Sequence, residues 1–157
     1  MVSIGVQTKN VVYDSDPAAG FQMLKDTGFS CADFSLNSYL LNTSLYQLDL
    51  NEFFDQSCAE LEHFFSPHKK GAAAAGITLN QMHMPYPLYV PNGDSGLNGY
   101  LQDTVARKSM HICAFFQCPY IVVHGFKLAR NLGSEEAEWE QTERFLDTLA
   151  PLAKELR

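Results

Sequence analysis

The sequence predicts an α/β fold in which parallel strands alternate with helices, in a single domain over residues 1–157. Two apolar runs, residues 77–82 and 120–123, have the length and composition of strands that are buried on both faces. Each run ends in a histidine, His83 and His124 respectively. Segments with helical spacing of apolar residues separate the strands, and no hairpin signal joins two of them. This alternation is typical of a parallel sheet, and such folds place their functional residues at the carboxyl ends of the strands.

The composition limits the class of protein. With 157 residues, 46% of them hydrophobic, the chain is long enough for one domain with a sizeable core. A formal net charge of −7 opposes nonspecific binding to nucleic acid or to an anionic membrane, because both attract Lys and Arg. No apolar run reaches the roughly 18 residues of a membrane span and the N-terminus lacks a secretion-signal pattern, so a cytoplasmic protein is expected. The four cysteines lack CxxC spacing and are expected to be buried free thiols.

The first βα unit is predicted within residues 2–28. Residues 2–8 carry the apolar side chains of a short strand. Asp16 is a suitable helix N-cap and Pro17 suits the first helical position, while Gly28 closes the helix.

The second unit begins with a strand over residues 29–34, which carries Asp33 near its end. Asn51 is predicted to cap a long helix whose apolar residues recur at intervals of three and four. Pro67 is expected to kink or break this helix. An alanine run followed by Gly76 then gives a helix end and a turn.

The third unit places His83 directly after its strand, and a long loop over residues 85–99 follows. Loops of about 15 residues in compact domains usually act as lids or binding loops. An apolar stripe predicts the next helix through Leu101, Val105, Ile112 and Phe116.

The fourth unit comprises the strand that ends at His124, a connecting loop and a final helix. The loop carries Lys127 and Arg130. Ser134 is expected to cap the helix, with two glutamates in the first turn, where the helix dipole favours negative charge. Its buried face is predicted to contain Trp139, Thr142, Leu146, Leu149, Leu152 or Ala153, and Leu156.

Four consecutive βα units form either a small doubly wound sheet or part of a (β/α)8 barrel. A barrel of typical size has roughly 250 residues, so this chain would hold about the first four of its units. A strand is the next element expected after the final helix.

Four segments carry a resemblance to a known superfamily. They are GVQT at residues 5–8, GFSCADF at 28–34, GITLNQMH at 76–83 and YIVVHG at 120–125. In order and spacing they resemble the xylose isomerase-like TIM-barrel superfamily, most of all the bacterial sugar phosphate isomerases/epimerases, with endonuclease IV as a more distant relative. The resemblance implies that the chain is the N-terminal half of a barrel whose complete form is a metal-dependent isomerase or epimerase of carbohydrate metabolism.

The resemblance also implies a divalent metal (Mn, Mg, Co or Zn) at the carboxyl end of the barrel. In the epimerases of the family, two Glu, an Asp and a His bind it, most or all from later strands. In endonuclease IV the third and fourth strands each end in a metal-binding histidine, and His83 and His124 match these positions. A mononuclear site needs about three or four protein ligands, so these two would form only part of it. The alternative is that both histidines line the barrel mouth and bond to backbone or water.

Several side chains are candidates for binding a sugar or sugar phosphate. Neighbouring strands lie about 5 Å apart, so His83 and His124 could grip the same sugar hydroxyl. Tyr86, in the long loop, could cover a sugar ring. Lys127 and Arg130 could hold a phosphate group.

The catalytic residues of such a reaction are not identified by the sequence. Isomerisation needs a carboxylate that takes a proton from the carbon next to a carbonyl, and the resemblance assigns this role to later strands. Asp33 could add a carboxylate to the same face, although an Asp in this position often bonds the backbone of the following loop instead.

Two other functions remain open. One is an endonuclease IV-like phosphodiesterase acting at abasic sites, against which the acidic balance of the chain counts. The other is a noncatalytic half-barrel that assembles with a second copy or a partner, because the first and fourth strands would leave open sheet edges.

Overall fold

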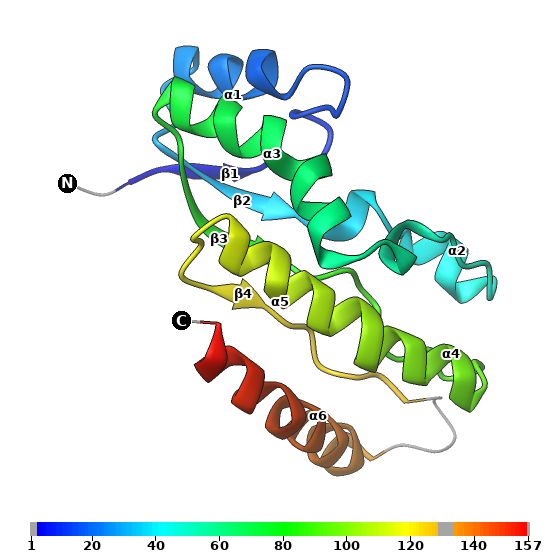
Figure 1. Ribbon diagram of the computed structural model, residues 1–157. Coiled ribbons are helices and arrows are strands. Elements are labelled where there is room, and N and C mark those ends of the chain that lie inside the picture. The colour runs from blue at the N-terminus through cyan, green and yellow to red at the C-terminus, as the bar shows by residue number, and fades with distance from the viewer. Residues whose placement is uncertain (1–2, 129–133, 157) are drawn as a thin grey trace.

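The computed structural model describes residues 3–128 and 134–156 (Figure 1). Its single sheet contains four parallel strands in the order β1-β2-β3-β4. The order follows the chain without a reversal, so every connection steps across the sheet in the same direction. The expected α/β fold with a parallel sheet is therefore confirmed. The strands are β1 Gly5–Gln7, β2 Cys31–Ser35, β3 Thr78–His83 and β4 Ile121–Val122.

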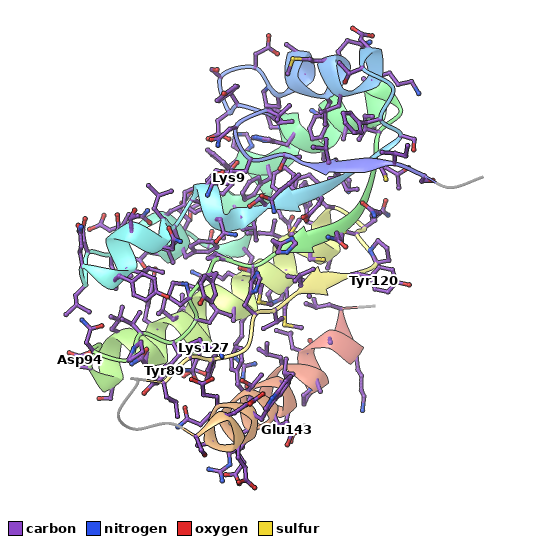
Figure 2. The ribbon with its side chains drawn as sticks, turned by 180° about the vertical axis from the view of Figure 1, so that it is seen from behind. Lys9, Tyr89, Asp94, Tyr120, Lys127 and Glu143 are labelled. Atoms are coloured by element: carbon purple, nitrogen blue, oxygen red, sulfur yellow. The ribbon has the colours of Figure 1, made fainter. Side chains whose placement is uncertain are left out.

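The main helices lie on one side of this sheet. Because parallel connections share one hand, connections that all step in the same direction place their helices on the same face. In Figure 1, α1, α3 and α5 lie side by side in front of the strands, and α6 packs next to α5. Figure 2, seen from behind, shows the strands in front of α3 and α5. We call the two sides the helix-covered face and the open face. The helices are α1 Pro17–Asp26, α3 Cys58–Ala75, α5 Ala106–Phe115 and α6 Glu135–Glu155.

Successive side chains of β2 point to opposite faces, as strand geometry requires. On the helix-covered face, Phe34 is 2% exposed, and its ring centroid lies 5.7 Å from that of Phe65 on α3 and 4.8 Å from that of Phe116 after α5. Asp33 and Ser35 point to the open face. The hydrophobic core therefore lies between the sheet and the helices.

Three of the predicted helix ends are confirmed. Asp16 Oδ1 accepts a hydrogen bond from the backbone N–H of Ala19, with Pro17 as the first helical residue of α1. Ser134 caps α6 in the same way. Gly76 ends α3 with a φ of +65°, a left-handed conformation that glycine adopts without a steric cost.

The start of α3 was predicted wrongly. Ser57, not Asn51, is its N-cap, because the Ser57 hydroxyl accepts from the Glu60 N–H while the Glu60 carboxylate accepts from the Ser57 N–H at 2.8 Å. Asn51 instead accepts from the N–H of Phe53 and precedes a separate 3-10 helix. Pro67 lies inside α3 and does not end it.

The long loop predicted over residues 85–99 is also wrong at its C-terminal end. A short helix, α4 (Ser95–Gly99), begins there with Asp94 as its N-cap and continues through a π-helical segment (Tyr100–Val105) into α5. Asn98 holds the preceding loop in place, since its side chain bonds the backbone N–H and C=O of Val90. These side-chain hydrogen bonds stabilise the helix, although it contains two glycines, which disfavour helical structure.

Other bounds differ by smaller amounts. All four strands are shorter than or shifted from their predicted ranges, and a short helix, α2 (Asn42–Tyr46), lies in the loop after β2. None of the helices in the described ranges combines the length and apolar composition needed to cross a membrane.

The predicted buried face of α6 is wrong for two of its residues. Trp139 is 60% exposed and Leu146 is 42% exposed, whereas Thr142 and Leu149 are buried. The helix packs instead through Phe145, whose ring stacks on Phe126 at a centroid distance of 5.0 Å. Trp139 lies outside the core.

Candidate functional site

The two histidines predicted from the sequence lie next to each other on the open face. His83 is the last residue of β3, and His124 follows β4, its neighbour in the sheet. The register pairs His83 with Val122. The two imidazole centroids are 5.6 Å apart with an angle of 34° between the rings. Both side chains therefore face a common space at the carboxyl end of the sheet.

Asp33 joins this pair from β2. Its Oδ2 lies 2.6 Å from Nδ1 of His83 and accepts a hydrogen bond from the Gln7 side chain at 3.2 Å. The alternative expectation, that Asp33 bonds the backbone of the next loop, is wrong because Asp33 is an internal residue of β2 that points to the open face. A carboxylate at Nδ1 fixes the orientation of an imidazole and leaves its other nitrogen for a ligand.

The protein does not satisfy all of the polar atoms on this face. The Asp33 Oδ1 atom and the Ser35 hydroxyl are buried and have no hydrogen-bond partner among the described residues. Ser35 is 2% exposed and is paired with His83 in the register. Because buried polar groups are normally bonded, atoms left over at one place indicate a surface that receives a polar ligand.

A cavity of about 340 Å³ opens beside His124. It lies between the loop after β3, the segment after β4 and the first turns of α6, and Figure 2 shows Lys127 in this region. The Tyr86 ring packs on His124 at a centroid distance of 5.0 Å. The backbone N–H of Tyr86 donates to the Asn37 side chain at 2.8 Å, which anchors the loop. Trp139 of α6 forms the opposite wall. This combination of aromatic surface and a few polar groups is typical of small-molecule sites.

The environment determines the charge states around the cavity. Burial lowers the pKa of His124, and the neighbouring His83 lowers it further, so the His124 imidazole is neutral at neutral pH. A neutral imidazole can accept a hydrogen bond or bind a metal ion. A hydrogen bond with Tyr86, assisted by burial, raises the pKa of Tyr46 to about 12.

Lys127, predicted to bind a phosphate, is already paired. Its Nζ lies 2.7 Å from Oε2 of Glu138, and the other carboxylate oxygen accepts from the backbone N–H of Leu128. These bonds raise the pKa of Lys127 and lower that of Glu138. A phosphate would have to compete with this carboxylate for the ammonium group. Arg130, the second predicted phosphate ligand, lies outside the described residues.

Two histidines of this chain are the predicted metal ligands, and each offers one nitrogen donor. His83 and His124 are close enough to contribute to one site, with Asp33 behind His83. In residues 3–128 and 134–156, no group of three or more His, Cys, Asp or Glu side chains is placed to hold a metal ion. The two imidazoles therefore fit part of a metal site that needs further ligands.

Ser35 and Trp139 were not among the residues predicted from the sequence to form the site, and Asp33 was predicted only as a carboxylate that could join the same face. A signal for Asp33 and Ser35 exists, because residues 31–35 alternate and place both on the face opposite Phe34. No comparable signal marks Trp139, whose position depends on how α6 packs.

Comparison with models of protein families and with curated proteins gave no match to this sequence.

Proposed function

We propose that the chain forms the N-terminal half of a (β/α)8 barrel of the sugar isomerase/epimerase type, with its open face lining the substrate site. The strand order supports this, because a doubly wound sheet reverses direction and carries helices on both faces. In a barrel the open face would become the interior, and the carboxyl ends of the strands would surround the site. Action in the cytoplasm is part of the proposal, and the buried free thiols Cys31, Cys113 and Cys118 favour a reducing compartment.

The observation that carries the proposal is the His83–His124 pair beside the aromatic cavity. A sugar has hydroxyl groups and an apolar C–H face, and the cavity contains side chains that can contact both. Tyr86 and Trp139 offer ring surfaces for the C–H face. His124 and Glu138 offer hydrogen-bonding groups for the hydroxyls.

In this proposal, each residue of the site has a distinct role. His83 and His124 would supply two of the ligands of a divalent metal, which would provide Lewis-acid chemistry at the substrate carbonyl. Asp33 holds the His83 ring in one orientation. Tyr86 packs against His124 and limits access of water from that side. The remaining ligands and the carboxylate that moves the proton would come from the second half of the barrel.

Metal binding tests the assignment of the two histidines. Titration calorimetry with Mn²⁺, Co²⁺ and Zn²⁺ should show one weak site on the chain, because the two histidines supply only part of the ligand set. Substituting His83→Ala or His124→Ala should each weaken binding by at least about tenfold. His63→Ala, an exposed position on α3, is the matched control and should leave binding unchanged. Undiminished binding in both site variants would remove the ligand assignment.

The chemistry is tested on the full product of the reading frame. With metal and a panel of ketoses and ketose phosphates in D₂O, proton NMR should show exchange at the carbon next to the carbonyl. DNA that contains an abasic site serves as the competing substrate. Cleavage of this DNA without sugar exchange would replace the isomerase with a phosphodiesterase.

A further inference from the structure

The C-terminal turn of α5 brings two cysteines together. The N–H of Cys118 donates to the carbonyl of Cys113 at 3.1 Å, and the N–H of Gln117 donates to the carbonyl of Ala114 at 2.8 Å. Gln117 has a φ of +57°. These three features define a Schellman motif, which places the side chains of its first and last residues in contact. Here both residues are cysteines.

The two thiols share one neighbour. Sγ of Cys113 lies 3.8 Å from the carbonyl oxygen of Tyr120, and Sγ of Cys118 lies 3.5 Å from the same oxygen. Cys113 Sγ is also 3.4 Å from the carbonyl oxygen of Cys118. Because both sulfurs approach one oxygen atom from a single turn, the two side chains are neighbours, as disulfide formation requires.

The two thiols border a surface groove, and they differ in acidity. Both thiols line a groove of about 530 Å³ between α5 and the C-terminal end of α6, although each residue is less than a tenth exposed. A hydrogen bond with Cys113 lowers the pKa of the Cys118 thiol, whereas the same contact and burial raise that of Cys113. Cys118 is therefore the more nucleophilic member.

The pair also contacts the sheet that carries the candidate site. The Tyr120 carbonyl that both thiols approach accepts a hydrogen bond from the N–H of Met82 at 2.9 Å. This hydrogen bond lies at the start of the pairing of β3 with β4. His83 is the next residue after Met82 on β3, and His124 lies two residues beyond the end of β4.

We propose that Cys113 and Cys118 are a redox-active dithiol that a low-molecular-weight disulfide, such as glutathione disulfide, oxidises reversibly to an intramolecular disulfide. The Cys118 thiolate attacks one sulfur of glutathione disulfide and releases one glutathione. The Cys113 thiolate then attacks the Cys118 sulfur of the mixed disulfide and releases the second glutathione. The protons of the two cysteines pass to the two glutathione thiolates, so the protein loses two electrons and glutathione disulfide gains them. Oxidation withdraws both sulfurs from the Tyr120 carbonyl and shifts β4 relative to β3.

Equilibration with glutathione tests the dithiol. The folded chain and the chain unfolded in urea are held in buffers of defined glutathione ratio, alkylated and analysed by peptide mass mapping. The turn preorganises the two thiols, so the folded chain should form the Cys113–Cys118 disulfide with an equilibrium constant at least about tenfold larger than that of the unfolded chain. Cys113→Ser should stop at a glutathione adduct on Cys118. Cys31→Ser and Cys58→Ser should leave the disulfide unchanged.

Two results would overturn the proposal. One is a folded chain that is oxidised no more readily than the unfolded chain, which would identify the cysteines as ordinary small core residues. The other is a disulfide that contains Cys31 or Cys58. The link to the sheet is read separately from the imidazole NMR signals of His83 and His124, which should move on oxidation. Unmoved signals would disprove the coupling.

Discussion

The two faces of the sheet satisfy their side chains in different ways. On the helix-covered face, Phe34 packs between the rings of Phe65 and Phe116. On the open face, its two chain neighbours Asp33 and Ser35 each keep a buried side-chain oxygen atom that has no hydrogen-bond partner in the part of the chain that the structure describes. Because these residues belong to one strand, the difference arises from what each face meets and not from the strand itself. We infer that the covered face supplies stability and the open face supplies binding.

The largest expected effect on stability is that of a substitution on the helix-covered face. Phe34→Ala removes a ring that is 2% exposed and should lower the free energy of unfolding by about 3–5 kcal/mol, measured by urea denaturation. Asp33→Asn, one residue away on the open face, is the matched variant and should change it by no more than about 1 kcal/mol. Similar losses in the two variants would erase the contrast between the faces.

A smaller effect concerns a histidine on the covered face. His68 is 2% exposed, lies against the rings of Phe34, Phe64 and Phe65, and has Nε2 2.9 Å from Oδ1 of Asp14. Burial lowers its pKa, and Asp14 offsets part of that change. The unfolded chain therefore takes up the proton at a higher pH than the folded chain.

Stability should consequently be greatest above the unfolded histidine pKa of about 6.5 and should fall as the pH drops through the lower folded value, by about 1.4 kcal/mol per unit of pKa difference. Urea denaturation between pH 7.5 and 5 measures this decline. His68→Gln should flatten it, whereas His63→Gln, an exposed control on the same helix, should not. An unaltered decline in His68→Gln would show that another group causes it.

The smallest effect on stability is expected at the cavity wall. Trp139 is 60% exposed, so Trp139→Ala should change the free energy of unfolding by no more than about 0.5 kcal/mol. If the cavity binds sugar, the same variant should weaken sugar affinity about tenfold, or about 1.4 kcal/mol. Leu146→Ala, an exposed apolar residue of α6, provides the control. A large loss of stability would assign Trp139 to the core instead.

Local signals predicted much of the fold. Asp16 and Ser134 cap helices through their own side chains, and Gly76 ends one through a backbone conformation that its neighbours disfavour, so these ends can be read from short windows. The start of α4 also has a local signal, the Asp94 N-cap, but two glycines with low helix propensity obscured it. The hydrogen bonds between Asn98 and Val90, eight residues apart, stabilise this helix and have no comparable mark in the sequence.

The candidate site was predictable only in part. The position of each histidine at a strand end follows from the apolar runs, and their adjacency follows from parallel strands in chain order. The contact between Asp33 and His83 depends on the register of β2 with β3, which shifts between Ala32 and Asp33. Such a bulge leaves no clear mark in the sequence, so the partner of His83 could not be predicted.

His83 and His124 face one shared site, and paramagnetic NMR tests this arrangement most directly. The chain has five histidines, each with its own imidazole signals. On addition of substoichiometric Mn²⁺, the signals of His83 and His124 should broaden together, while those of His63, His68 and His111 should stay sharp. Broadening of only one of the two, or of the helix histidines to the same extent, would contradict a shared site.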